Sequence, residues 1–171
     1  MNAGKYVFAA LAIAVLTHLA VVYATPRVLM AVAFDRIGAG GFNTWRPADR
    51  VTALSRQVVR PSPDFAYSAC VYDLSEGPVT ISAGPWGAYW SLSLYAANSD
   101  NFYVIDDREA RRGAAITLIR RGRSHPDDAQ TVVESPSVRG IALIRRLAPT
   151  LDSYNAARQV ARGDICAGLT R

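Results

Sequence analysis

The chain has 171 residues, half of them apolar, which is enough for one domain with a hydrophobic core but too few for two domains plus a membrane segment. This apolar content excludes general disorder. The net charge of +5 comes from eighteen arginines and one lysine spread along the chain among 14 acids. Because a nucleic-acid-binding tail concentrates its basic residues, we expect no nucleic-acid partner.

The N-terminal segment has the composition of a membrane span. Tyr6–Ala24 is a nineteen-residue run without formal charge, and as a helix it covers about 28 Å, roughly the thickness of the bilayer hydrocarbon. Lys5 and the α-amine precede the run, which predicts a cytoplasmic N-terminus and an exported C-terminal part. Residues 1–24 are therefore assigned as the membrane anchor. The length of the run favours an uncleaved signal-anchor, whereas Val22-Tyr23-Ala24 fits a signal-peptide cleavage site, so both alternatives stay open.

One polar side chain and one proline interrupt the apolar N-terminal region. An imidazole inside a single span needs a hydrogen-bonding partner, so we expect His18 to pair with a neighbouring helix. Pro26 is typical of the first turn of a helix, which predicts a second helix with Val28–Phe34 along the membrane surface. Three glycines within residues 38–41 indicate a linker. Residues 25–60 are assigned as this juxtamembrane helix and linker.

Residues 61–171 change to the period of two that is typical of strands. The first two expected strands flank a turn at residues 73–78 and predict a hairpin. The third strand alternates apolar and polar residues, which predicts one buried face. The expected strands are Phe65–Tyr72, Val79–Ile81, Tyr89–Tyr95, Phe102–Ile105, Ala114–Ile119, Thr131–Val133 and Gly140–Leu147.

The C-terminal residues return to helical spacing. Leu151, Tyr154, Ala157 and Ala161 recur every three or four residues, and Gly163 is a typical helix end. The sequence therefore predicts a mainly β fold: an antiparallel β-sandwich or open barrel with a short C-terminal helix, preceded by one transmembrane helix.

The inventory of chemically reactive side chains is small. No G-x-S-x-G motif and no closely spaced His or Cys pair occurs, so we expect no catalytic residues, no metal and no cofactor. His125 lies in a loop beside Asp127 and Asp128, where exposure is expected. Cys70 and Cys166 are the only cysteines. In an oxidising compartment they would form a disulfide that joins the C-terminal helix to the sheet, and otherwise they would be two buried thiols.

Four segments carry a family resemblance: Arg60–Ser68 (RPSPDFAYS), Val71–Val79 (VYDLSEGPV), Tyr89–Tyr95 (YWSLSLY) and Asn98–Phe102 (NSDNF). They resemble the bacterial "domain of unknown function 1254" family, and the chain is similar to its short, membrane-anchored members, which have equivalents of His18. The resemblance implies a β-rich fold and brings no established activity. Longer members are fused to a "domain of unknown function 1214". Because this chain ends before any such domain, we expect a separate membrane or periplasmic protein to supply it.

Two functions are compatible with these features. The first is a bacterial inner-membrane protein whose periplasmic domain is a binding or assembly module for another envelope protein. The alternative is a small envelope enzyme or a binder of a polar, sugar-like ligand. The candidate ligand or partner surface is the same for both and consists of aromatic, Asp and Asn residues: Tyr67, Tyr72, Asp73, Trp90, Tyr95, Asn98 and Asp100.

Overall fold

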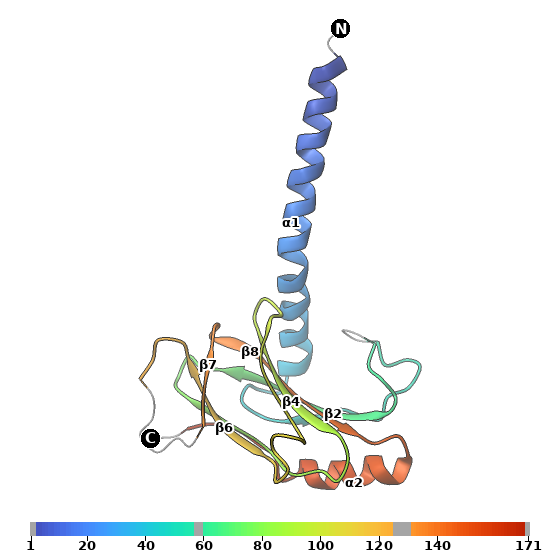
Figure 1. The fold of residues 1–171 in the computed structure, drawn as a ribbon, viewed down its shortest axis with the longest axis vertical. Coiled ribbons are helices and arrows are strands. Elements are labelled where there is room, and N and C mark those ends of the chain that lie inside the picture. Colours follow the sequence, from blue (N-terminus) through green and yellow to red (C-terminus); the bar gives the residue numbers. More distant parts are fainter. Residues whose placement is uncertain (1–2, 57–59, 125–130, 170–171) are drawn as a thin grey trace.

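The computed structural model describes residues 3–56, 60–124 and 131–169, which form one long helix and a β-sandwich (Figure 1). In the described residues, the five-stranded sheet A has the order β1-β2-β8-β4-β5, and the four-stranded sheet B has the order β7-β6-β3-β9. The elements are α1 (Ala3–Gly38), β1 (Arg46–Pro47), β2 (Phe65–Asp73), β3 (Val79–Ala83), β4 (Trp90–Ala96), β5 (Asn101–Asp106), β6 (Ala114–Arg120), β7 (Val132–Ser135), β8 (Arg139–Leu147), α2 (Leu151–Ala161) and β9 (Ile165–Gly168). The mainly β sandwich with an N-terminal apolar helix and a short C-terminal helix is confirmed.

α1 continues through Pro26 without a break, so the expectation of a separate second helix is wrong. Proline cannot donate to the carbonyl of Val22, but polar side chains on either side bond to neighbouring carbonyls. The Thr25 hydroxyl donates to the Val21 carbonyl at 2.7 Å, and the Arg27 guanidinium donates to the Tyr23 carbonyl at 2.7 Å. Such contacts are typical of prolines inside apolar helices.

The last turns of α1 pack on the β-sandwich and do not lie apart from it along a membrane surface. Met30 and Ala33 are buried in a cluster with Val71 of β2 and Ile141 of β8. Figure 1 shows the rest of α1 projecting away from the sandwich. The apolar residues after Pro26 therefore fix the helix to the face of sheet A that points away from sheet B, which we call the outer face.

The main core lies between the two sheets. It contains Trp90, Leu92 and Leu94 of β4 together with Ile81 and Leu118 of sheet B, all fully buried. The opposite side of β4 is also buried, so the expectation of a strand with one exposed face is wrong. β4 lies between β8 and β5, and its outward serines are too short to reach past their taller neighbours.

The expected hairpin between the first two strands is also wrong. β2 pairs with β8 in sheet A, whereas β3 pairs with β6 and β9 in sheet B. The turn after Asp73 carries the chain from one sheet to the other, with Gly77 at φ +151°. One pair, β6 with β7, is parallel, although only antiparallel pairs were expected. By contrast, β4 and β5 form an antiparallel hairpin.

α2 forms as the sequence predicts. Thr150 caps its N-terminus, because the hydroxyl accepts a hydrogen bond from the backbone N–H of Ser153. Its buried side, which includes Tyr154 and Ala157, packs against Ala66 and Trp86. After Gly163 the chain forms β9, a strand that the sequence pattern does not predict.

Candidate functional site

The disulfide predicted from the two cysteines is present. Cys70 in β2 is bonded to Cys166 in β9, with Cα atoms 6.7 Å apart. Because β2 belongs to sheet A and β9 to sheet B, the bond joins the two sheets through the core. It does not join α2 to a sheet, as the sequence had suggested, because the chain leaves α2 and enters β9 before it reaches Cys166.

Two of the seven candidate surface residues lie inside the core. Tyr72 and Trp90 are fully buried between the sheets. The Tyr72 hydroxyl donates to the Tyr95 carbonyl at 3.1 Å and lies 3.0 Å from the Ser135 Oγ. Burial raises the pKa of this hydroxyl above its ordinary value of 10.0. A ligand could reach Tyr72 or Trp90 only if the sandwich opened, so these two side chains support the fold.

The other candidate residues lie in different places. Tyr95 packs against the docked end of α1 on the outer face of sheet A, whereas Tyr67 lies further along the same face. Asn98 and Asp100 are bonded to each other in the β4–β5 turn, with Asn98 Nδ2 2.6 Å from Asp100 Oδ2. The structure therefore does not bring the seven residues together on one surface.

Asp73 ties the segment after α1 to sheet A. Its backbone N–H donates to Asn43 Oδ1 at 2.8 Å, and Asn43 Nδ2 donates back to its carbonyl at 3.1 Å. Its carboxylate accepts from Arg139 Nε at 2.6 Å and from the Ser75 N–H at 2.8 Å. Burial raises the pKa of this carboxyl, but the bonds from Ser75 and Arg139 outweigh burial and hold it below the ordinary value of 3.8. These contacts stabilise the join between helix and sandwich.

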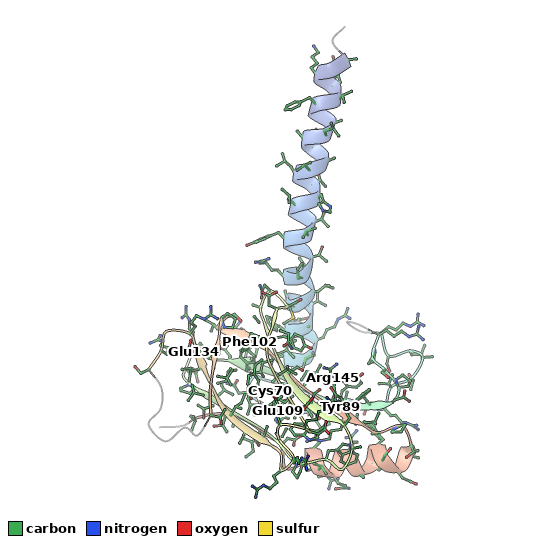
Figure 2. The ribbon with its side chains drawn as sticks, in the orientation of Figure 1. Cys70, Tyr89, Phe102, Glu109, Glu134 and Arg145 are labelled. Atoms are coloured by element: carbon green, nitrogen blue, oxygen red, sulfur yellow. A yellow bond between two sulfur atoms is a disulfide. The ribbon has the colours of Figure 1, made fainter. Side chains whose placement is uncertain are left out.

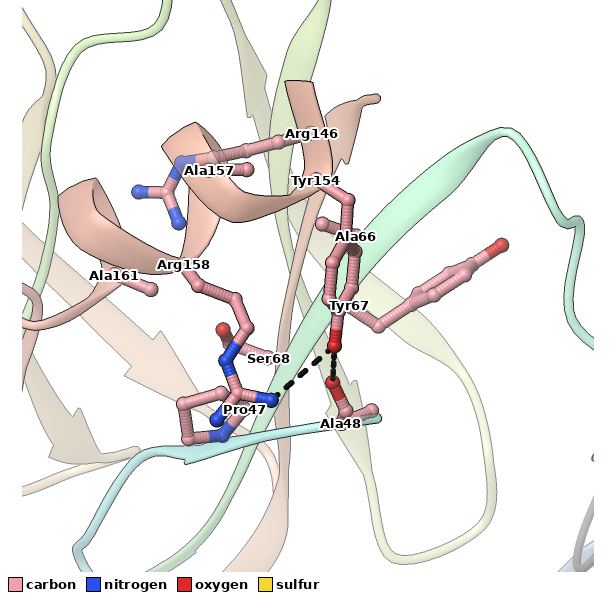
Figure 3. Close-up of a pocket in the computed structure, with 10 residues that line it drawn as sticks. All are labelled: Pro47, Ala48, Ala66, Tyr67, Ser68, Arg146, Tyr154, Ala157, Arg158 and Ala161. Carbon is pink, nitrogen blue, oxygen red and sulfur yellow. Dashed lines mark hydrogen bonds between the residues drawn. The ribbon is translucent and has the colours of Figure 1, made fainter. Parts of the chain in front are cut away.

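A cavity lies beneath α2, where the helix crosses β1 and β2 (Figure 3). The Tyr154 hydroxyl donates to the Ala48 carbonyl at 2.9 Å and accepts from Arg158 at 3.2 Å. The space left between these contacts is about 10 Å³, which is the size of one water at most. It cannot hold a substrate.

α1 is long and apolar enough to cross a membrane. Near its start, Lys5 Nζ lies 5.2 Å from the centre of the Tyr6 ring, and further along the Arg27 guanidinium lies 3.6 Å from the centre of the Tyr23 ring. Tyrosines and basic residues are typical of the two bilayer interfaces. The two tyrosines are about 26 Å apart along a helix. His18 lies between them, and within the described residues it has no hydrogen bond.

Three aromatic rings cluster on the outer face of sheet A, beyond the end of α1. The Phe65 ring lies 6.2 Å from that of Tyr67 and 6.0 Å from that of Tyr89. Strand register places Arg145 of β8 beside Tyr67 and opposite Ser91 of β4. The Leu147 N–H donates to the Tyr89 carbonyl at 2.9 Å, so Tyr89 lies beside β8 two residues from the position of Arg145 (both labelled in Figure 2). We call this surface the outer patch, and its residues are Phe65, Tyr67, Tyr89, Ser91, Ser93, Val104, Leu143 and Arg145.

Several polar atoms of the outer patch have no partner. Ser91 and Ser93 are fully buried, and their hydroxyls make no hydrogen bond to any described residue. The Arg145 Nε is buried and unbonded, and this guanidinium has no acidic partner in the described part of the chain. Buried polar groups are rarely left unpaired, so this cluster needs an explanation.

The neighbouring arginine has an acidic partner, although its Nε is also buried and unbonded. Arg146 points to the opposite side of β8 and forms two bonds to the Asp164 carboxylate, at 2.8 and 2.9 Å. Both side chains are buried, and Arg146 also donates to the Gly84 carbonyl at 3.2 Å. Sequence reasoning missed both arginines. Alternation along β8 could have separated their faces, but no sequence signal could have shown which one has a partner.

Within residues 3–56, 60–124 and 131–169, no group of three or more His, Cys, Asp or Glu side chains could hold a metal ion. The predicted position of His125, with Asp127 and Asp128, lies outside the described residues.

Comparison with known protein families matches residues 42–167 to the family described as "Protein of unknown function (DUF1254)". The chain belongs to this family. No curated protein matches it. Among solved structures it is similar to the VPA0106 protein from Vibrio parahaemolyticus, with a TM-score of 0.65 and 14% identity over 86% of this chain and 36% of that one. A second similar structure is an uncharacterized protein from Burkholderia cenocepacia, with a TM-score of 0.47 and 16% identity over 66% of this chain and 33% of that one.

This DUF1254 chain therefore spans about a third of the length of the two solved proteins it is similar to. At 14% identity, the likeness to the Vibrio protein extends to the fold alone. The family match covers the sandwich and the segment that leads into it. It contains the whole outer patch and both cysteines of the disulfide.

Proposed function

We propose that this DUF1254 protein is anchored in the bacterial inner membrane by α1 and that its periplasmic sandwich is a binding module that assembles with another envelope protein. The long apolar helix, with a cation–tyrosine pair near each end of its uncharged run, supports the anchor. The bonded cysteines support an oxidising compartment, since disulfides persist in the periplasm and are rare in the cytoplasm.

The outer patch is the observation that carries the binding role. It combines Phe65, Tyr67 and Tyr89 with an unpaired arginine, and aromatic residues and arginine are enriched at the centres of protein interfaces. Tyr89 is 40% exposed and Val104 is 55% exposed. Because α1 is docked on the same face, a partner here would also lie beside the anchor.

The proposed partner is a membrane or periplasmic protein that carries the companion domain of unknown function 1214, which longer relatives of this type contain in the same chain. Its second contact would be a transmembrane helix packed on the His18 side of α1. A hydrogen bond from a neighbouring helix would satisfy the imidazole, and such bonds between membrane helices contribute about 1 kcal/mol.

Affinity purification of the full chain in mild detergent tests this proposal. We expect one envelope protein to copurify with the wild type and to be recovered in smaller amount with His18→Leu. Leu16→Ala is the matched control, because it lies about 200° around the helix from His18 and leaves that side intact. If the wild type is recovered alone and turns over an envelope substrate, the protein is an enzyme and the binding-module proposal is wrong. Equal recovery of the partner with His18→Leu would show that the His18 side of α1 is not part of the binding surface.

A further inference from the structure

We infer that the outer patch recognises a carboxylate side chain of the partner protein and that Arg145 is the residue that binds it. This inference rests on the proposed function and adds the chemistry of the partner. It predicts an Asp or Glu of the partner, flanked by apolar residues, seated on the centre of sheet A's outer face.

Arg145 differs from the arginines that have an acidic partner. Arg46 of β1 shares its buried, unbonded Nε, but only Arg145 belongs to the outer patch. Arg139, Arg146 and Arg158 each have an acidic partner, at 2.6, 2.8 and 3.5 Å respectively. Arg145 is half-buried and has no acidic partner among the described residues, although its Nε is shielded from water. A guanidinium in this setting is a fork of donors that matches a carboxylate.

The residues beside Arg145 on β4 are short serines. Ser91 lies directly opposite Arg145 in the strand register, and Ser93 lies two residues further along β4. Both side chains are fully buried, and neither hydroxyl has a partner within the described chain. Because both side chains are 0% exposed, they form the covered floor of the outer patch beside Arg145, and the half-buried guanidinium is the polar group that a partner can reach.

The surroundings favour a protein side chain over other anions. Small-molecule sites are open pockets, whereas the aromatic and aliphatic neighbours cover Ser91 and Ser93 completely. Asp106 of β5 lies directly opposite Ser91, so one carboxylate of this chain is already close to the site. A single carboxylate is therefore favoured over a doubly charged phosphate. Aromatic rings around a central ion pair exclude water and strengthen it.

Photo-crosslinking in intact membranes tests the inference. A benzophenone amino acid replaces Tyr89, which is exposed at the edge of the outer patch. We expect one crosslinked protein, and we expect the crosslinked peptide to contain an Asp or Glu within a few residues. Adding Arg145→Met should lower the crosslink yield at least about tenfold, as expected when one partner of a desolvated charge pair is removed. The matched control is Arg121→Met, an exposed arginine after β6, which should leave the yield unchanged.

A charge exchange completes the test. Arg145→Glu should abolish the crosslink, and replacing the identified acid of the partner with arginine should restore it. Intact Cys70–Cys166 disulfide and unchanged tryptophan fluorescence show that each variant is folded. Crosslinking that persists in Arg145→Met, or a charge exchange that fails to restore it, overturns the carboxylate assignment. A partner that copurifies but gives no crosslink from position 89 overturns the inference and leaves the binding module standing. The absence of any copurifying partner overturns both.

Discussion

Replacing Arg146 should destabilise the sandwich strongly, whereas the same change at Arg145 should not. The two residues are adjacent in β8 and point to opposite sides of sheet A. Arg146→Met removes two bonds to Asp164 and one to the Gly84 carbonyl. Arg145→Met removes a guanidinium that makes no bond to the described residues.

The structure sets the size of the difference. The side chains of Arg146 and Asp164 are 2% and 0% exposed, so the variant leaves a buried carboxylate with only the Gly84 N–H, 2.8 Å away. Breaking a buried ion pair from one side lowers the free energy of unfolding by about 3–5 kcal/mol. At position 145 we expect a change within about 0.5 kcal/mol.

Urea unfolding of the full chain in mild detergent, followed by tryptophan fluorescence, measures both effects. Trp45, Trp86 and Trp90 all lie outside α1, so the signal reports the sandwich. With a slope of about 2 kcal/mol per M, the midpoint for Arg146→Met should fall by about 2 M. Arg146→Lys keeps the charge but cannot form both bonds to Asp164. Its urea midpoint should therefore lie between those of Arg146→Met and the wild type. Equal midpoints for the position 145 and 146 variants would refute this reasoning.

The remaining predictions concern the disulfide, the orientation of the chain and pH. The double variant Cys70→Ala/Cys166→Ala opens a link across 96 positions and should lower the free energy of unfolding by about 4–5 kcal/mol in the same assay; an unchanged midpoint would contradict this. Alkaline phosphatase fused to the C-terminus should be active, whereas a reporter that works only in the cytoplasm should not; the reverse pattern would invert the topology. The lowered pKa of Asp73 contributes stability that is present above its ordinary value of 3.8 and is lost as pH falls through the folded-state value. The stability difference between the wild type and Asp73→Asn should therefore shrink below about pH 4, and a constant difference from pH 7 to 3 would contradict it.

Local patterns gave most of the strands, the terminal helix and the cysteine pair. The alternation in residues 89–95 and the helical spacing after Thr150 depend on neighbours in sequence, and both elements form where expected. The hairpin between β2 and β3 failed for a different reason. A short polar turn can return a strand to its own sheet or pass it to the opposite sheet, and only the pairing with distant β8 and β9 decides between these.

The candidate site shows the same division. Aromatic and polar residue types pointed to Tyr67 and to Tyr72, but the two side chains lie on opposite faces of β2. Arg145 was missed because its significance lies in the absence of an acidic partner among the described residues, which is a property of the whole sheet face.

The sequence by itself determined the features that arise within one segment: an apolar helix long enough for a bilayer, strands with a period of two, and a capped terminal helix. Tertiary structure alone decided that α1 docks on sheet A, that Arg146 is paired while Arg145 is not, and that the two cysteines join opposite sheets. The physical reason is that hydrophobic and hydrogen-bonding periodicity is local, whereas burial and ion pairing depend on which distant residues the chain brings together.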